Sequence, residues 1–510
     1  MDLSSLGIET NFGIVDWCIV IAYLGLIVSV GIYIRRYIKN ATDFMVAGRG
    51  LKSLLAIATM IGTELGLVTV VYAAQKGFTG GFAAFHIAIV AAIGALFIGL
   101  TGFIVVPLRK LKVMTIPEYY EKRFGKGVRI LGGAILAIAG ILNMGLFLKA
   151  GSIFVSGVTG MVSDFQIKLI MSVMLALVLL YTTLGGMVSV VVLDYIQFVV
   201  LSIALLFTTA LAINHLGFSE IVDGVARIMG EPGFNPLSEE SFGPEYIVWQ
   251  LLMGGLACSV WAPAVIRALS AENTKVVKRL YTWSSLGFLI RFMIPYFFGI
   301  CALVFVSKDP KLSAYFLPDG KLADPAITLQ AMPLFISQII PAGLIGIVTA
   351  GMLAAFMSSH DSYLLCWSTV LTQDVIAPWF KKPLSSKVRL LMTRIFIVLI
   401  GIYILIWGLW YELGQDLWDY MLITGSIYMI GAMVLLFFGL YWKRASKVGA
   451  YMALITGFGA VVGLKPVQRF LFDKNWPTEI VGLTVLIAAI IMIIVGSLIF
   501  PDKTSTENKE

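Results

Sequence analysis

Long apolar runs follow one another almost from end to end of this 510-residue chain, and they constrain its fold more than any other feature. A run of about 20 apolar residues is what an α-helix needs to cross the hydrocarbon core of a bilayer. With 59% hydrophobic and only 13% charged residues, the chain leaves no room for a large water-soluble domain. The sequence therefore predicts an all-α membrane protein and excludes an ordinary soluble enzyme.

Thirteen segments have the length and the apolar character of membrane-spanning helices. They are residues 13–34, 53–76, 81–108, 130–158, 167–187, 188–214, 247–271, 283–307, 340–372, 392–410, 417–442, 448–465 and 479–499. The longest of these segments must tilt or break to fit the bilayer. Two intervening segments, 215–246 and 308–339, carry short amphipathic patches that favour surface helices.

Lys and Arg are distributed unevenly between alternate loops. Cytoplasmic loops of membrane proteins are enriched in these residues. We therefore expect the N-terminus outside, a cytoplasmic tail at 500–510, and a location in the plasma or inner cell membrane. The net charge of +8 then reflects membrane orientation rather than nucleic-acid binding. The basic clusters lie at 35–52, 109–129, 275–279, 381–394 and 443–447.

Cysteines and clustered aromatic residues carry little functional signal in this chain. All four cysteines lie inside apolar runs without metal-ligand spacing, so we interpret them as packing residues rather than as a disulfide or metal site. Trp410, Tyr411 and Trp418 are typical of an interfacial aromatic belt. The cysteines are Cys18, Cys258, Cys301 and Cys366.

The second and seventh spans are each interrupted near mid-depth. The interruptions are Gly62-Thr63-Glu64-Leu65-Gly66 and the stretch from Gly254-Gly255 to Pro263. If each span opens a five-helix unit, the second unit must be inverted, because five is odd. Paired interruptions are typical of a transporter's central site, where unwound backbone offers carbonyls and amides. The alternative is that these glycines only permit close helix packing, and spacing alone leaves both interpretations open.

The ninth span carries a stripe of oxygen ligands. Ala355, Ser358, Ser359 and Ser362 stand at helix positions i, i+3, i+4 and i+7, so one face presents a carbonyl and three hydroxyls. Oxygen ligands of this kind suit a hard cation. The alternative, which is the commoner fate of isolated serines, is a hydrogen bond back to the helix backbone or a bridge to a neighbouring helix.

We single out four ionisable residues that lie within apolar spans: Asp194, Asp361, Glu64 and Arg291. Intramembrane carboxylates are costly and usually face the bundle interior, where they pair with a cation or carry a proton. Asp194 could instead be hydrated at the membrane interface. Glu64 and Arg291 either form a structural ion pair or share a cavity with a charged substrate, and the sequence leaves this choice open.

Three stretches together resemble the sodium:solute symporter family, which includes sodium-coupled carriers of sugars, proline, pantothenate, sialic acid and monocarboxylates. The first is the loop TIPEYYEKRFG at 115–125. The second runs from Gly185-Gly186 to Asp194 and Gln197, and the third is Ala355-x-x-Ser358-Ser359. They occur in the family's order and on the expected spans. The resemblance covers approximately residues 13–445, and thirteen spans with the N-terminus outside are the family's usual bacterial form.

The resemblance implies a LeuT-like five-plus-five inverted repeat within a single membrane-embedded transporter domain over 1–510. The repeats would be 53–214 and 247–442, with an extra N-terminal helix at 13–34 and two extra helices at 448–499.

A coupled sodium ion is the cofactor that the resemblance implies. Its ligands would be backbone carbonyls at Gly62, Leu65 and Ala355 with the hydroxyls of Ser358 and Ser359.

Some family members have a second sodium site beside the carboxylate that matches Asp194. In those members, hydroxyls occupy the positions of Asp361 and Ser362, and this chain departs from that pattern because position 361 is Asp. A second acidic ligand would either strengthen cation binding or make the site protonatable.

For the substrate, the resemblance points to Thr63, Glu64, Gly66, Trp261 and Arg291. Sugar carriers of the family have Asn where this chain has Trp261, which disfavours a sugar, and they have Lys where it has Arg291. Proline carriers have Asp at the position of Glu64. Because Arg can hold a carboxylate through two parallel hydrogen bonds, this set suits a small carboxylate or an amino acid.

We therefore predict a secondary active transporter that couples uptake of a small organic solute to sodium, with the bilayer as its environment and no obligate protein partner. A proton-coupled symporter of the same fold is the first alternative. An intramembrane enzyme using Glu64, Asp194 or Asp361 as acid and base is less favoured, because no nucleophile–base pair is evident. A channel would move solute only downhill.

Overall fold

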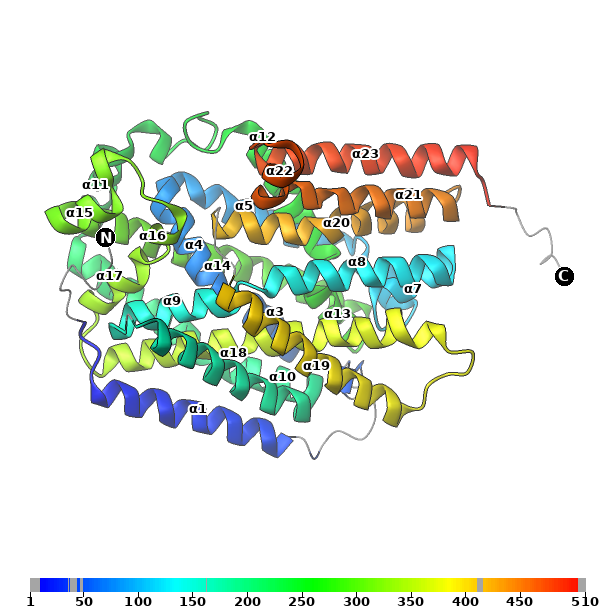
Figure 1. The fold of residues 1–510 in the computed structure, drawn as a ribbon, viewed down its shortest axis with the longest axis horizontal. Helices are drawn as coiled ribbons and strands as arrows, with labels where there is room; N and C mark the ends of the chain where they lie inside the picture. Colours follow the sequence, from blue (N-terminus) through cyan, green and yellow to red (C-terminus); the bar gives the residue numbers. More distant parts are fainter. Residues whose placement is uncertain are drawn as a thin grey trace.

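The structure, a computed structural model, describes residues 10–34, 36, 44–45, 49–161, 163–410 and 416–502. Within these ranges every regular element is a helix, and one isolated backbone bridge joins Leu51 to Ala271. The helices run largely along the long axis of the molecule (Figure 1). The all-α expectation is confirmed. Arg35 and Lys39 of the basic cluster expected at 35–52, and the tail beyond residue 502, lie outside the described residues.

The longer helices form the body of the bundle. They are α1 (Ile14–Ile34), α3 (Ser53–Glu64), α4 (Leu67–Gly80), α5 (Phe85–Thr101), α8 (Lys126–Met144), α9 (Phe147–Thr159), α10 (Asp164–Leu216), α14 (Thr274–Lys308), α18 (Leu344–Val370), α19 (Ser386–Trp410), α20 (Leu417–Tyr441), α21 (Lys447–Phe458) and α23 (Thr478–Ile499).

Shorter helices connect them. They are α6 (Val105–Lys110), α7 (Ile116–Phe124), α11 (Phe218–Met229), α12 (Gly243–Trp249), α13 (Ala262–Ser270), α15 (Pro310–Phe316), α16 (Pro325–Thr328), α17 (Ala331–Ile339) and α22 (Lys465–Phe472). The surface helices expected in 215–246 and 308–339 are present. The helices α11, α15, α16 and α17 gather at one end of the bundle, which we call the loop-rich end, and α7 lies at the opposite, basic end (Figure 1).

Ten helical segments of the described chain are long and apolar enough to cross a membrane, and a bent pair would make an eleventh. Three features separate this number from the thirteen predicted spans. The helix α3 has only 12 residues. The helix α10 runs through both predicted spans 167–187 and 188–214, with a kink at Gly186, where φ is 50°. The helical segments Lys447–Gly463 and Lys465–Phe472 meet at an angle of 94°. The count of thirteen stays a prediction.

The second predicted span is broken in its middle, as the sequence indicated. The helix α3 ends at Glu64 and α4 begins at Leu67, while Leu65 and Gly66 have non-helical backbone angles. A Cβ atom at Gly66 would collide with the hydroxyl of Ser359 on α18. Glycine therefore lets α18 pack directly against the break.

The seventh predicted span is irregular as well. Between α12 and α13 the chain forms a π-helical turn at Gln250–Gly255 and a 3-10 turn at Leu256–Ser259. The helix α13 then restarts with Pro263 in its first turn, where the missing N–H of proline costs nothing. The helix α13 packs against α3, so the two interrupted spans meet inside the bundle.

The N-terminal helix α1 is tied to the start of α18. The buried carboxylate of Asp16 accepts the backbone N–H groups of Gly343, at 2.8 Å, and Gly346, at 2.7 Å. These groups belong to the first turn of α18, whose N–H groups have no partner within the helix. A side chain of α1 therefore caps α18, and α1 also packs against α10.

Candidate functional site

Two serines of α18 reach the backbone at the break between α3 and α4. Ser358 Oγ donates to the carbonyl of Gly62 at 3.2 Å, and Ser359 Oγ donates to the carbonyl of Thr63 at 3.2 Å. These hydroxyls thus bond across to another helix rather than back to their own. The carbonyl oxygen of Ala355 would lie 3.6 Å from a Cβ at Gly66, so it faces the same break.

The residues expected to hold sodium are therefore brought together. Ser358 contacts Gly62, while Ser359 and the Ala355 carbonyl lie near Gly66, and Leu65 belongs to the non-helical stretch between these contacts. Each offers an oxygen without formal charge, and an alkali cation binds such oxygens well.

The carboxylate of Asp194, on α10, lies directly behind these serines. It accepts hydrogen bonds from Ser358, from Thr59 at 2.5 Å and from Thr63 at 2.9 Å. Its side chain is fully buried. The alternative of a hydrated carboxylate at the membrane interface is therefore wrong, because burial among hydroxyl donors from other helices places Asp194 in the interior.

Arg267, on α13, is the cation that faces Asp194. Its Nη2 lies 3.5 Å from Asp194 Oδ2 and donates to Thr63 and, at 2.6 Å, to Ser362 Oγ, while Nη1 donates to the carbonyl of Pro263 at 2.9 Å. The guanidinium is fully buried. Sequence analysis missed Arg267, although the rule that singled out Asp194, an ionisable residue within an apolar span, applies equally to it.

The hydrogen-bond partners of Asp361 are not those of Asp194. Tyr181 donates its hydroxyl to Asp361 Oδ2 at 3.0 Å and to the carbonyl of Met357 at 3.1 Å. Ser362 Oγ lies 3.2 Å from Asp361 Oδ1, so Ser362 stands between Asp361 and Arg267. Of the residues expected at a second cation site, Asp194 and Ser362 are thus already in contact with the protein's own cation.

Glu64 and Arg291 form an ion pair at the wall of a central cavity. Arg291 Nη1 donates to Glu64 Oε2 at 2.8 Å and to the Glu64 carbonyl at 2.9 Å. The rings of Phe288 and Phe292 lie 4.5 and 4.3 Å from the guanidinium and hold it in place. The two residues therefore form an ion pair and also line a cavity. That a charged substrate shares this cavity stays a prediction.

The central cavity has a volume of about 110 Å³ and a largely aromatic wall. Trp261 lines it and donates its indole N–H to the Tyr363 hydroxyl at 3.1 Å. Thr63 and Gly66, also expected here, face elsewhere: Thr63 joins the Asp194 cluster and Gly66 packs on Ser359. The lining residues include Glu64, Tyr72, Asn143, Cys258, Trp261, Arg291, Phe292, Tyr363 and Trp418.

Most of the cavity lining escaped the sequence analysis, including Trp418 and Asn143. Trp418 was interpreted as part of an interfacial belt, and this is wrong, because its ring packs on Tyr72 at 4.9 Å and on Phe292 at 5.4 Å at the cavity wall. The side chain of Trp410 and residue Tyr411 lie outside the described residues. Asn143, on α8, carried no pattern that distinguished it from a polar packing residue.

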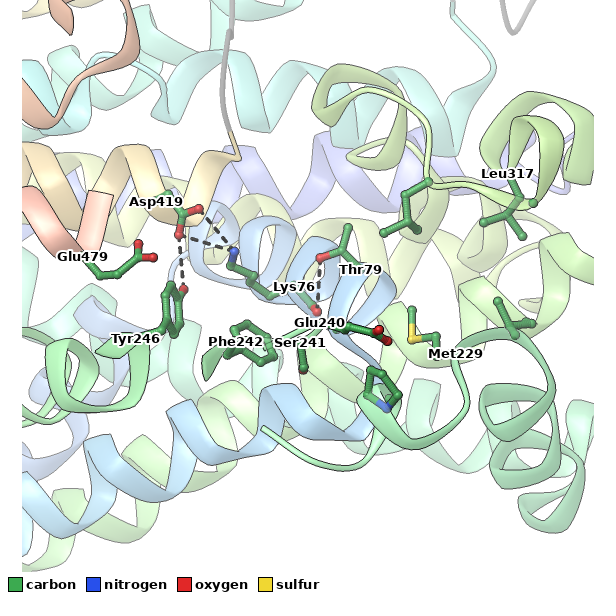
Figure 2. Close-up of a pocket in the computed structure, with 16 residues that line it drawn as sticks. Lys76, Thr79, Met229, Glu240, Ser241, Phe242, Tyr246, Leu317, Asp419 and Glu479 are labelled. Carbon is green, nitrogen blue, oxygen red and sulfur yellow. Dashed lines mark hydrogen bonds and ion pairs between the residues drawn. The ribbon is translucent and has the colours of Figure 1, made fainter. Parts of the chain in front are cut away.

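Charged residues lie next to the rings of Tyr72 and Trp418, on the side of the loop-rich end. Lys76, one turn after Tyr72 on α4, lies 3.4 Å from Asp416 and 3.3 Å from Asp419 at the start of α20. Tyr246 donates to Asp419 at 3.2 Å (Figure 2). Burial raises the pKa of Asp416 to about 6 against the opposing effect of Lys76.

A second, larger cavity of about 470 Å³ lies beyond these charged residues. Lys76, Phe242, Tyr246, Asp419 and Glu479 stand along its wall (Figure 2). Among the described residues, the two cavities have no lining residue in common. The Tyr72–Trp418 ring pair and the Lys76 ion pairs thus stand between them.

The loop that resembles the family signature lies at the basic end. Thr115 Oγ1 caps α7 by accepting the backbone N–H of Glu118, and the Glu118 carboxylate accepts the backbone N–H of Met114, one residue before the N-cap. Thr115 donates to Asp374 at 2.8 Å, and Arg129 pairs with Asp374 at 2.9 Å. These bonds fasten the α7–α8 region to the segment that follows α18.

Comparison with known proteins agrees with this geometry. A family model described as the sodium:solute symporter family matches residues 44–457. The sodium/glucose cotransporter of Vibrio parahaemolyticus is 26% identical over 487 residues, covering 90% of this chain and 86% of that one. The sodium/sialic acid symporter of Proteus mirabilis is 25% identical over 470 residues, covering 89% and 90%.

Solved structures share the fold. A substrate-bound, outward-open Na+-coupled sialic acid symporter superposes with a TM-score of 0.79 at 21% identity, covering 96% of this chain and 99% of that one. MhsT in complex with L-phenylalanine gives a TM-score of 0.52 at 16% identity, covering 88% and 98%. At these identities the likeness establishes the helical transporter fold alone.

Proposed function

The chain belongs to the sodium:solute symporter family, and from that premise we propose that it imports a small organic carboxylate or amino acid together with sodium. Membership makes it a sodium-coupled solute symporter of the membrane, and a transporter rather than an enzyme. The substrate class, the sodium ligands and the orientation are the parts that we propose.

The observation that carries the substrate class is the Glu64–Arg291 pair at the wall of the central cavity. Arg presents a planar fork that matches a carboxylate, and the flanking rings of Phe288 and Phe292 fix its direction. Carboxylate binding here uses a cation that the empty protein keeps paired, so no charge is left unpartnered before the substrate arrives.

A sugar is the second candidate, because relatives of this chain are named as glucose cotransporters. Aromatic residues such as Trp261 and Trp418 would suit the apolar face of a sugar ring. A neutral sugar, however, gives no reason for an ion pair at the cavity wall. We therefore rank it below a charged substrate.

Sodium would bind between the Gly62, Leu65 and Ala355 carbonyls and the hydroxyls of Ser358 and Ser359. The convergence of these groups at the break supports this assignment. An inward sodium gradient and the membrane potential, worth about 2.3 kcal/mol per elementary charge per 100 mV, would drive accumulation.

We further propose that the loop-rich end faces outward and the basic end faces the cytoplasm, following the distribution of Lys and Arg. The inverted repeats would be 53–214 and 247–442, each opened by an interrupted span. Rocking of the repeat bundle would then expose the central cavity to either side in turn.

Purified protein in proteoliposomes tests the proposal. We expect radiolabelled alanine, proline or lactate to accumulate above its equilibrium level under an inward sodium gradient, while glucose does not. Liposomes with potassium replacing sodium on both sides are the control. Solute movement that never exceeds equilibrium would reject symport, and accumulation that follows a pH gradient without sodium would favour the proton-coupled alternative.

A further inference from the structure

We propose that the substrate is a zwitterion, with its carboxylate on Arg291 and its ammonium group between Glu64 and Asn143, which makes Asn143 a residue that determines specificity. This inference rests on the proposed function, because it selects among the carboxylate-bearing solutes of the same cavity. Its grounds are the charge balance of the cavity and the hydrogen-bonding atoms that its walls leave free.

The charge balance separates a zwitterion from a simple carboxylate. Glu64 and Arg291 cancel each other in the empty cavity, where their side chains are only 10% and 12% exposed. A monocarboxylate that takes Arg291 leaves Glu64 buried, charged and without its cation, which is costly. A zwitterion supplies a new partner to both residues, so each buried charge stays paired and the net charge does not change.

The unpaired hydrogen-bond acceptors of Glu64 and Asn143 also favour a zwitterion. Glu64 Oε2 accepts from Arg291, whereas Glu64 Oε1 is buried and has no hydrogen-bond partner among the described residues. Asn143 Oδ1 is also buried and has no hydrogen-bond partner within the described part of the chain. Both residues line the central cavity. Two buried acceptors, one of them anionic, require a donor, and an ammonium group has three N–H bonds and no acceptor.

The orientation of the Asn143 amide is fixed by its surroundings. Its Nδ2 donates to the carbonyl of Met421 at 2.7 Å and to Thr424 Oγ1 at 2.9 Å. The Thr424 hydroxyl in turn donates to the carbonyl of Tyr420 at 2.7 Å, so it acts as an acceptor toward Asn143. Both amide hydrogens are therefore used on α20, and Oδ1 is the atom left for a ligand.

The rest of the wall suits a cation and a small apolar side chain. The rings of Tyr72, Trp261 and Trp418 line the cavity, and aromatic faces attract a desolvated ammonium group. The volume of about 110 Å³ limits the solute to a small molecule. An α-amino acid with a modest side chain meets these requirements together.

Matched triads of probes test the inference directly on the wild-type protein. Each triad contains an amino acid, the acid without its amine and the amine without its acid: alanine, propionate and ethylamine, or valine, 3-methylbutanoate and 2-methylpropylamine. Binding is measured by thermal shift of the purified protein in sodium chloride and in potassium chloride. We expect the amino acid to bind at least about tenfold more tightly than either truncated probe, and only with sodium.

The variant pair Asn143→Ala and Ser426→Ala separates ligand binding from packing. Asn143→Ala should reduce the preference for alanine over propionate by about tenfold. Ser426→Ala removes a buried hydroxyl of α20 that bonds to its own helix backbone at Leu422, so it should keep the preference. If the two variants lose the preference equally, Asn143 is a packing residue and its proposed role is wrong.

The outcome distinguishes this inference from the proposed function. If propionate binds as well as alanine and accumulates in proteoliposomes under a sodium gradient, carboxylate symport stands and the zwitterion inference is overturned. If glucose alone shifts the melting temperature, both fail. Preferential binding of the amino acids with loss of that preference in Asn143→Ala supports the inference.

Discussion

The ammonium nitrogen of Lys76 lies 3.4 Å from a carboxylate oxygen of Asp416, which joins the end of α4 to the start of α20. This pair, with Asp419, lies directly above the Tyr72–Trp418 contact, at the boundary between the two cavities. A partly buried ion pair between two helices resists their separation, because parting them leaves each charge without its partner. The pair therefore ties α4 to α20 at the boundary between the two cavities.

Replacing Lys76 with Met should open a path between the two cavities. The free thiol of Cys258 lines the central cavity and reports on access to it. In a background with the exposed Cys18 changed to Ser, we expect a membrane-impermeant thiol reagent added at the loop-rich face to modify Cys258 several times faster in Lys76→Met. Lys308→Met, which removes a more exposed Lys–Glu pair, is the control. An unchanged modification rate would show that the aromatic rings alone close the cavity.

Removing the Ser359 hydroxyl should weaken sodium dependence before it affects maximal rate. A desolvated cation that loses one ligand in five should bind roughly five- to tenfold more weakly in Ser359→Ala, and less so in Ser358→Ala. The measurement is the sodium concentration for half-maximal uptake. Ser368→Ala, on the same helix but bonded to its own backbone at Leu365, should behave as wild type. Normal sodium dependence in both the Ser358 and the Ser359 variants would contradict the proposed sodium site.

Arg267→Gln should destabilise the fold far more than a typical surface substitution. Loss of the guanidinium leaves Asp194 buried without its cation, a defect that costs about 3–5 kcal/mol. We expect a marked fall in melting temperature in detergent, and partial recovery in the double variant Arg267→Gln with Asp194→Asn. Arg227→Gln, at an exposed pair, is the control. Equal losses in the single and double variants would mean that the two groups do not interact energetically.

Arg291→Lys should lower substrate affinity much more than sodium affinity. Lys keeps the positive charge but cannot offer two parallel hydrogen bonds, so the affinity for a carboxylate should fall by roughly tenfold or more. Half-saturation for substrate and for sodium, measured in the same proteoliposomes, gives the comparison. Arg227→Lys, on the exposed helix α11, is the matched control. A parallel loss of both affinities would instead point to a structural role.

The features predictable from the sequence are those that carry a local pattern. The break at Gly62–Gly66 and the serine stripe of α18 are visible as spacing, and the structure brings them into contact. The span count was harder to obtain, because two helices follow one another without a loop at the kink at Gly186, so that α10 covers two predicted spans.

Other features depend on contacts between helices distant in sequence. The ion pair of Arg267 with Asp194 requires α13 to meet α10, and Trp418 reaches the cavity only because α20 packs beside α4. Asn143 is distinguished by two bonds to α20 and one unused oxygen, none of which leaves a mark on the neighbouring sequence. Such residues are identified by three-dimensional packing, not by periodicity.

The capping of α18 by Asp16 couples the sodium ligands to the periphery of the molecule. Ser358 and Ser359 belong to α18, and the first turn of α18 is hydrogen-bonded to Asp16 of α1. A tilt of α18 would therefore also move α1. The side chains of Ile14, Val15 and Ile21 on α1 are exposed and apolar, so they face acyl chains in a membrane. We therefore expect the turnover of the carrier to depend on the acyl-chain length and the fluidity of the surrounding membrane.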